Sequence, residues 1–128
     1  MKKIISTEKA PKAVGAYSQG ISFSGLVFTS GQIPIDPATG ELNTGDIASQ
    51  TEQAMKNVKA IVEEAGLTMN DVLKVTILLA DIEDFAVVNQ VYESFFTGHY
   101  PARSCFAVKD LPKGAKIEIE AIAGKDCC

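Results

Sequence analysis

Arg103 is the strongest candidate for binding chemistry, and it lies in a Pro-Ala-Arg-Ser-Cys segment. We expect a strand over residues 102–108, in which alternation places Arg103 and Cys105 on one face and Ser104 and Phe106 on the other. A guanidinium flanked by small residues can present parallel N–H groups to a carboxylate. The same pattern fits an arginine in a structural ion pair, so the sequence leaves both interpretations open.

Two carboxylates, Glu118 and Glu120, alternate with apolar residues in a predicted strand over residues 116–123. Alternation sends both to one face, roughly 7 Å apart, and turns Ile117 and Ile119 toward the helices. Either glutamate can act on water as a general base if a second chain buries that face. Otherwise both are solvated surface groups, and spacing alone does not choose between these roles.

The other reactive side chains give weaker signals. Ser30 has no base for a serine-hydrolase triad, because the single His99 fits a surface position after a helix better. Cys105 fits a small buried thiol better than a nucleophile, and Tyr17 fits either a core ring or a hydrogen-bond donor in a pocket. One His and three poorly spaced Cys do not form a tetrahedral metal site, so no metal is expected.

Length and composition favour one globular domain over residues 1–128, with 46% hydrophobic and 22% charged residues. The net charge of -4 disfavours nucleic acid, whose binding requires a basic face. We expect a cytoplasmic protein with no membrane association, because the sequence shows neither a signal peptide nor an apolar run of about 20 residues. The odd cysteine count, with Cys127 and Cys128 adjacent, favours reduced thiols over disulfides.

The first half of the chain predicts a hairpin and then a helix. Apolar-polar alternation over residues 21–30 surrounds Gly25, which is typical of two strands joined by a tight turn. The prolines that follow predict a loop over residues 31–40. Apolar residues then recur at three- and four-residue steps up to Ala65, so we expect a helix that Asp46 caps and Gly66 ends.

The second half predicts a central strand over residues 72–79, a helix from Asp84 to Phe96, and two closing strands. The order β-β-α-β-α-β-β predicts an α+β fold in which both helices cover one face of a mixed sheet. No element remains for the other face. Val72, Leu78 and Phe106 would form an exposed apolar patch there, which favours self-association.

Six segments form a pattern that covers nearly the whole chain. They are Gly-Ala-Tyr-Ser-Gln at 15–19, Thr-Ser-Gly-Gln-Ile-Pro at 29–34, Asn-Val-Lys at 57–59, the set Asp84, Phe85, Val88, Asn89 and Tyr92, Pro-Ala-Arg-Ser-Cys at 101–105, and Ile-Glu-Ile-Glu-Ala-Ile-Ala at 117–123. In this order and spacing they resemble the RidA/YjgF family of reactive intermediate deaminases. The departures are Ala16, where many members have proline, and the Cys127-Cys128 tail.

The resemblance implies a chorismate-mutase-like fold and a homotrimer whose sheets form a central barrel, with sites in the clefts between subunits. It implies cofactor-free hydrolysis of 2-iminobutanoate, 2-iminopropanoate and enamines such as 2-aminoacrylate, which pyridoxal-phosphate enzymes release, to 2-keto acids and ammonia. It assigns Arg103 to the substrate carboxylate and Glu118 to the attacking water. The pocket-lining residues that it implies are Tyr17, Ser30, Gly31, Phe85, Asn89 and Cys105.

Two other functions fit parts of the sequence. A non-enzymatic module that binds 2-keto or 2-imino acids would keep Arg103 but would not need Glu118, so the presence of Glu118 favours the enzyme. An RNA-directed role, as a translation inhibitor or ribonuclease, has been described for relatives in this family. The acidic balance and the lack of a basic stripe disfavour that role here.

Overall fold

The computed structural model describes residues 1–126, and the predicted thiols Cys127 and Cys128 lie outside that range. Within it the elements are β1 (Lys3–Ile5), β2 (Gly20–Phe23), β3 (Leu26–Thr29), α1 (Ile47–Glu64), β4 (Val72–Leu79), α2 (Phe85–Glu93), β5 (Ala102–Ala107) and β6 (Ile117–Gly124). This order confirms the predicted β-β-α-β-α-β-β arrangement and adds β1, a short strand that the sequence analysis missed.

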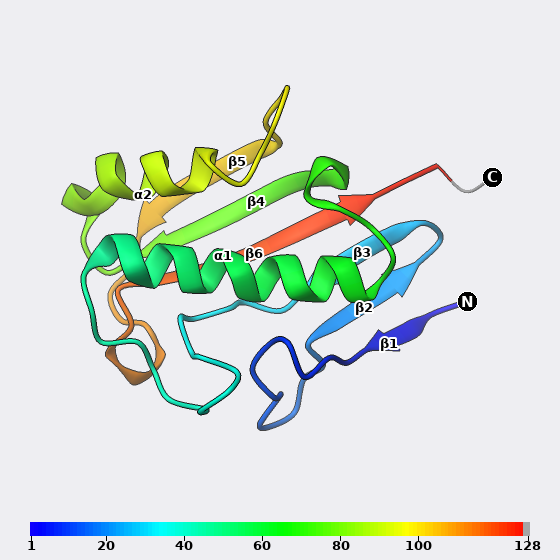
Figure 1. The fold of residues 1–128 in the computed structure, drawn as a ribbon, viewed down its shortest axis with the longest axis horizontal. Helices are drawn as coiled ribbons and strands as arrows, with labels where there is room; N and C mark the ends of the chain where they lie inside the picture. The colour runs from blue at the N-terminus through cyan, green and yellow to red at the C-terminus, as the bar shows by residue number, and fades with distance from the viewer. Residues whose placement is uncertain (127–128) are drawn as a thin grey trace.

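The strands form one mixed sheet in the order β1-β2-β3-β6-β4-β5. Only β4 and β5 pair in parallel, and α2 makes the crossover between them. Both helices lie against the same face of the sheet, α1 over its centre and α2 beside β4 and β5 (Figure 1). The prediction of two helices on one face of a mixed sheet is therefore confirmed.

Helix α1 begins and ends where its capping residues predict. Asp46 Oδ1 accepts a hydrogen bond from the Ser49 N–H at 2.9 Å, which satisfies one of the unpaired amides of the first turn. At the other end Gly66 adopts a φ of 87°, and the Leu67 N–H donates to the Val62 carbonyl at 3.2 Å. This backward bond is a Schellman cap, which requires the left-handed conformation that glycine adopts readily.

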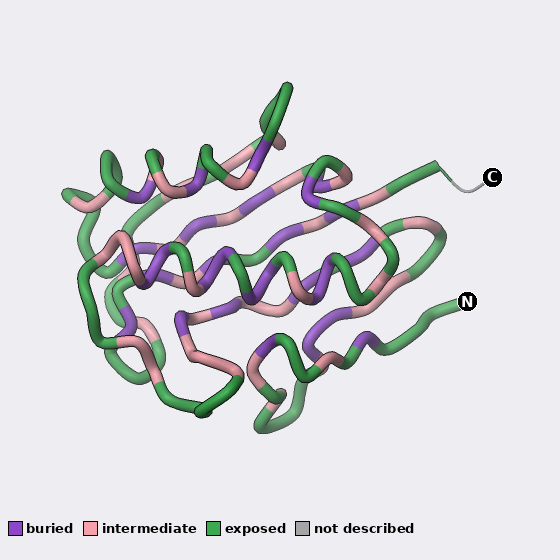
Figure 2. Tube along the Cα trace, in the orientation of Figure 1, coloured by how far each residue is buried: buried purple, intermediate pink, exposed green. Residues whose placement is uncertain are grey.

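The core lies between α1 and the central strands of the sheet, where Figure 2 shows buried positions alternating with accessible ones. Burying each aliphatic side chain stabilises the fold by about 1.5–3 kcal/mol, so this layer fixes where the strands lie. Its most deeply buried members are Met55, Val58, Ile61 and Val62 of α1 with Val75, Ile77 and Leu79 of β4 and Ile117 and Ile119 of β6.

Helix α2 is shorter than predicted, because its regular turns end at Glu93 rather than at Phe96. Beyond that point the chain tightens, and the Phe96 N–H donates to the Glu93 carbonyl at 3.2 Å. Phe96 is nevertheless buried, and its ring lies 4.9 Å from the ring of Tyr92. Apolar residues therefore continue to pack in the core beyond the end of α2. The spacing of apolar residues along the sequence extends just as far, so it predicts a helix that is too long.

The sequence predicts Val72 on the open face of the sheet, and this prediction is wrong. Val72 is buried against the helices, because the ladder between β4 and β6 has a bulge between Val72 and Lys74. The extra residue interrupts the alternation of the strand, so that Leu73 is exposed. Lys74 Nζ donates a hydrogen bond to Ser104 Oγ at 3.3 Å. Counting back from Leu78 in steps of two therefore assigns Val72 to the wrong face.

No helix within residues 1–126 covers the open face of the sheet (Figure 1), and this face carries large apolar side chains. Phe106 is 49% exposed, as predicted, and Leu78 is half-buried. Other exposed apolar residues extend this surface across the neighbouring strands: Phe23 of β2, Leu26 and Phe28 of β3, and Leu73 of β4. Neither helix in residues 1–126 is long and apolar enough to cross a membrane.

Candidate functional site

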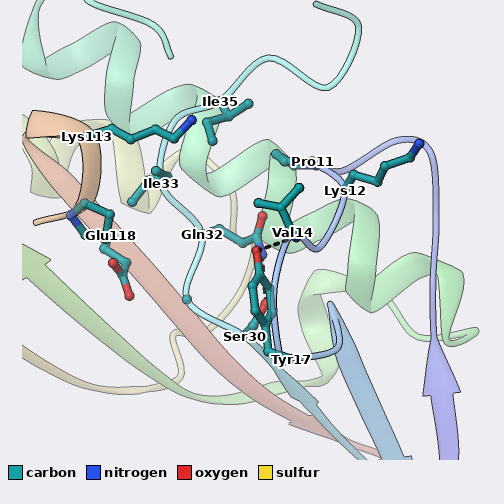
Figure 3. Close-up of a pocket in the computed structure, with 12 residues that line it drawn as sticks. Pro11, Lys12, Val14, Tyr17, Ser30, Gln32, Ile33, Ile35, Lys113 and Glu118 are labelled. Carbon is teal, nitrogen blue, oxygen red and sulfur yellow. Dashed lines mark hydrogen bonds between the residues drawn. The ribbon is translucent and has the colours of Figure 1, made fainter. Parts of the chain in front are cut away.

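A cavity of about 400 Å³ opens beside β6, and we call it the Glu118 pocket. Four residues assigned from the sequence line it: Tyr17, Ser30, Gly31 and Glu118. Figure 3 shows the Glu118 side chain extending from β6 toward the segment that leaves β3, with Tyr17 and Ser30 beyond it. The rest of the lining is mixed: Val14, Ile33 and Ile35 are apolar, whereas Lys12, Gln32 and Lys113 are polar or charged. A small molecule with one polar end fits such a lining.

Gly31 lets the Glu118 carboxylate lie directly against the backbone. A Cβ atom at position 31 would overlap Glu118 Oε2 and would lie 2.8 Å from its Cδ. Gly31 does not adopt a positive φ, so space and not backbone conformation requires glycine there. The carboxylate is therefore held at the pocket wall by a close approach that any side chain at position 31 would prevent.

Glu118 and Glu120 share the open face, as alternation predicts, but their surroundings differ. Their partners on β4 are Leu78 and Thr76, and Glu118 is half-buried whereas Glu120 is exposed. Burial raises the pKa of the Glu118 carboxyl, and the negative charge of Glu120 raises it further. A carboxylate with a raised pKa beside a cavity is suited to taking a proton from water near neutral pH.

Ser30 lies at the end of β3, and its hydroxyl is already engaged. Ser30 Oγ donates to the Gln19 carbonyl at 3.0 Å and accepts from Gln32 Nε2 at 3.1 Å. No histidine is placed to activate it, because His99 follows α2 and lines no wall of the Glu118 pocket. Ser30 therefore shapes the pocket and is not a nucleophile.

A second cavity, of about 300 Å³, surrounds Arg103 on β5, and we call it the Arg103 pocket. Arg103 Nη1 donates to Asn89 Oδ1 at 2.8 Å, and the guanidinium carbon lies 5.3 Å from the ring centre of Phe85 and 4.9 Å from that of Tyr92. These contacts fix the plane of the guanidinium. Within residues 1–126 no carboxylate lies within 4.0 Å of it, so the structural ion pair is not found there.

Tyr92 belongs to the Arg103 pocket, although the sequence analysis named it only in the family pattern and gave it no role in the site. Its Oη is buried and has no hydrogen-bond partner among the described residues. Burial raises its pKa to about 12 despite the nearby Arg103 charge, so the hydroxyl keeps its proton and remains a donor. Its position three residues after Asn89, on the same helix face, is the signal that could have identified it.

Cys105 follows Arg103 on the same face of β5, as predicted, and is half-buried. Burial raises the pKa of its thiol, and the Arg103 charge opposes this only in part. The sulfur therefore stays protonated, which fits the predicted small thiol better than a nucleophile. Within residues 1–126 no group of three or more His, Cys, Asp or Glu side chains is placed to hold a metal ion.

The two pockets lie on opposite faces of the sheet in a single chain. Arg103 faces α2 and contacts its side chains, whereas Glu118 points away from the helices. The structure thus brings Tyr17, Ser30, Gly31 and Glu118 together, and separately Phe85, Asn89, Arg103 and Cys105. Chemistry that needs both the arginine and the glutamate requires parts of two chains.

Comparison with known proteins finds relatives that match almost the whole chain. The sequence model of the family described as Endoribonuclease L-PSP matches residues 7–125. The 2-iminobutanoate/2-iminopropanoate deaminase of Escherichia coli strain K12 is 54% identical over 126 residues, which cover 96% of this chain and 98% of that protein.

Two crystal structures from Escherichia coli show the same fold. TdcF with bound serine is 49% identical with a TM-score of 0.93, over 97% of this chain and 99% of that one. The YjgF gene product is 52% identical with a TM-score of 0.93, over 96% of this chain and 98% of that one. The family model, the sequence identity and the shared fold together show that the chain belongs to the RidA/YjgF family.

Proposed function

We propose that the protein is an imine deaminase that hydrolyses 2-iminobutanoate and 2-iminopropanoate, and enamines such as 2-aminoacrylate, to 2-keto acids and ammonia. The observation that carries this proposal is the half-buried Glu118 carboxylate, which lies against Gly31 in a small pocket and has a raised pKa. A module that only binds keto acids has no need for such a group. The deaminase of Escherichia coli, at 54% identity, supports the same assignment.

The complete site forms between two subunits of a homotrimer, where the Arg103 pocket of one chain meets the Glu118 pocket of the next. The opposite orientations of Arg103 and Glu118 in one chain support this arrangement. The apolar open face supports it as well, because Phe28, Phe106 and their neighbours would otherwise remain in water. Three such faces turned inward would form the central barrel.

In this site Arg103 holds the substrate through its carboxylate. The guanidinium donates two parallel N–H groups, while Asn89 and the rings of Phe85 and Tyr92 keep its plane fixed. Tyr92 lines the same cavity, and its buried hydroxyl has no hydrogen-bond partner among the described residues. Holding the substrate turns the attack of water into a positioned step, which removes much of its entropic barrier.

Glu118 then handles the proton of the attacking water. Its carboxylate takes a proton from the water as the water oxygen bonds to the imine carbon, and it passes this proton to the imine nitrogen to give a tetrahedral aminoalcohol. The proton of the aminoalcohol hydroxyl is then transferred to the nitrogen, the carbon–nitrogen bond breaks, and ammonia leaves as the keto oxygen forms. Positioned acid–base help of this kind accelerates a reaction by about 10²–10⁴-fold.

A coupled assay tests the proposal directly. A threonine or serine dehydratase generates the imine, and the release of 2-ketobutyrate or pyruvate is followed with and without the protein. We expect the protein to accelerate release, and to do so equally after exhaustive chelation. If the protein binds 2-ketobutyrate but leaves the release rate unchanged, it is a binding module and the proposed function is wrong.

A further inference from the structure

Residues 6–18 form one wall of the Glu118 pocket, and apart from the buried Ala10, which packs in the core, they have few ties to the rest of the protein. Pro11, Lys12, Val14 and Tyr17 of this loop line the cavity. No backbone-to-backbone hydrogen bond joins the loop to another part of the described chain. Val14 is 74% exposed and Tyr17 is 51% exposed, so core packing does not hold these two side chains in place.

The amide of Gln19 makes the hydrogen bonds that tie this loop to the rest of the described chain. Gln19 Oε1 accepts from the Thr7 N–H at 2.6 Å, and Nε2 donates to the carbonyls of Thr7, Ala10 and Pro11 at 3.0, 3.2 and 2.8 Å. Every other side-chain hydrogen bond of the loop within residues 1–126 stays inside it. Gln19 is only 4% exposed, so these bonds are sheltered from water.

The backbone of Gln19 connects this wall to the adjacent end of β3. Its carbonyl accepts from both the N–H of Ser30, at 2.8 Å, and the hydroxyl of Ser30, at 3.0 Å. One residue thus joins the loop that carries Tyr17 to the strand end that carries Ser30 and Gly31. Figure 3 shows Tyr17 and Ser30 next to each other on this side of the pocket.

We infer that Gln19 is a positioning residue for the reaction, which holds the loop of residues 6–18 against Ser30 and thereby sets the place of Tyr17 in the Glu118 pocket. The effect of Gln19 on the reaction rests on the proposed function, whereas its effect on the loop does not. The position requires an amide, because its donors meet three carbonyl oxygens while its acceptor meets an N–H. A glutamate there would direct negative charge at the carbonyls, and a leucine would leave all of these groups without partners.

The first test measures the loop itself and does not depend on activity. Lys9 and Lys12 are exposed in the loop, so trypsin cleavage after them reports how often the loop opens. We expect Gln19→Leu and Gln19→Glu to be cleaved there at least about tenfold faster than wild type. Equal cleavage rates in either variant and wild type would overturn the inference, whether or not the protein proves to be a deaminase.

Val62→Ala is the matched control for general loss of stability. Val62 is fully buried on α1 and lines neither the Glu118 pocket nor the Arg103 pocket, so its truncation weakens the core without touching the loop. We expect this variant to melt at a lower temperature while keeping wild-type cleavage at Lys9 and Lys12 and wild-type kcat/KM. Faster cleavage at those lysines in Val62→Ala would show that the loop responds to stability in general, and the inference would fail.

The second test asks whether Gln19 acts through Tyr17. In the wild-type background we expect Gln19→Leu to lower kcat/KM by about 10–100-fold, and in a Tyr17→Phe background by less than about threefold, because coupled residues are not additive. An equal fold loss in both backgrounds would contradict the positioning role. If wild type itself shows no deaminase activity, the proposed function fails, while the cleavage test still decides what Gln19 does.

Discussion

Glu118 and Glu120 are two residues apart on one strand face, yet Glu118 is half-buried in the Glu118 pocket whereas Glu120 is exposed. Gly31 provides the space into which the Glu118 carboxylate fits, and the resulting burial raises its pKa. Glu120 is exposed and acts on Glu118 through its charge. The difference between the two glutamates depends on Gly31, which lies far from them in the sequence. The spacing of residues within β6 therefore could not predict it.

The substitution Glu118→Gln should remove the base and keep the shape of the pocket. We expect kcat to fall by about 10²–10⁴-fold, while 2-ketobutyrate binding, measured by calorimetry, survives because the Arg103 pocket is intact. The folded-state pKa of Glu118 is raised, so its ionised form destabilises the fold above that pKa, and stability is recovered as pH falls. The melting temperature of the variant at pH 7 should therefore not drop. An active Glu118→Gln protein would show that the acid is wrongly assigned.

Glu120→Gln should shift the pH profile and leave the chemistry in place. Activity requires ionised Glu118 and therefore falls as pH drops through its raised pKa. Removing the neighbouring negative charge lowers that pKa, so the acidic limb of the kcat/KM profile should move to lower pH. A profile measured from pH 4 to 8 tests this. A dead Glu120→Gln protein with normal assembly would contradict the roles given to the two glutamates.

Arg103→Ala should abolish activity and leave the fold intact, because it removes a half-buried charged clamp and not core volume. Arg103→Lys keeps the charge but presents one ammonium where the guanidinium offers two parallel donors, so it should recover little. Losing a hydrogen-bonded partner of a substrate charge typically costs about 2–5 kcal/mol. Values of kcat/KM for both variants, with melting curves as controls, test this. Wild-type activity in Arg103→Lys would rule out recognition by two donors.

At the scale of elements, the segment after β3 is held from two sides. The N–H and carbonyl of Gln32 pair with those of Ile119 at 2.8 and 3.0 Å, next to Glu118 on β6. From α1, the fully buried Asn57 donates to the carbonyls of Ile33 and Ile35 at 3.2 and 2.9 Å. This double attachment keeps Gly31 against the Glu118 carboxylate.

Gly31→Ala should disable the site through this contact. The added Cβ overlaps the Glu118 carboxylate, which must move, so we expect kcat/KM to fall by about 10²-fold or more. Gly45→Ala is the matched control, because its Cβ would meet Ser49 Oγ at 2.6 Å, also without a positive φ, but away from both pockets. Equal activity in the two alanine variants would show that the approach of Glu118 to Gly31 does not matter.

Most elements could be predicted because their signals are local. The capping residues of α1 are adjacent to the helix that they predict, and the alternating pattern of β6 lies within the strand itself. The errors come from interactions between distant segments. The bulge that buries Val72 arises from pairing with β6, and β1 is too short to show a period before it pairs with β2. The buried hydroxyl of Tyr92 belongs to the site only because α2 packs beside β5.

At the scale of the whole molecule, the open face explains why one chain is insufficient. The exposed apolar side chains lie on one face of the sheet, and the helices cover its other face. The sequence could predict this need for a partner from the count of elements. The predicted alternation also puts Phe106 and Glu118 on the open face and Arg103 on the opposite one, and the structure has Arg103 and Glu118 on these faces.

We expect the protein to sediment as a trimer of the 13.6 kDa chain at micromolar concentration. Phe28→Glu places a charge on the open face, where Phe28 is 41% exposed, and should dissociate the assembly and abolish activity together. Lys59→Glu changes a charge on the outer face of α1 and should leave both unchanged. A wild-type protein that sediments as a stable monomer would reject the trimer and the shared site.

Complementation between two inactive variants tests whether Arg103 of one chain and Glu118 of the next share a site. Arg103→Ala and Glu118→Gln chains are mixed in equal amounts, unfolded, refolded together and assayed, with each variant refolded alone as the control. Each site takes its arginine from one chain and its glutamate from the next, so random trimers should carry both residues at about a quarter of their sites, with about a quarter of wild-type activity. Each variant alone should stay inactive. If the mixture is as inactive as its components, Arg103 and Glu118 of different chains do not share a site, and the account is wrong.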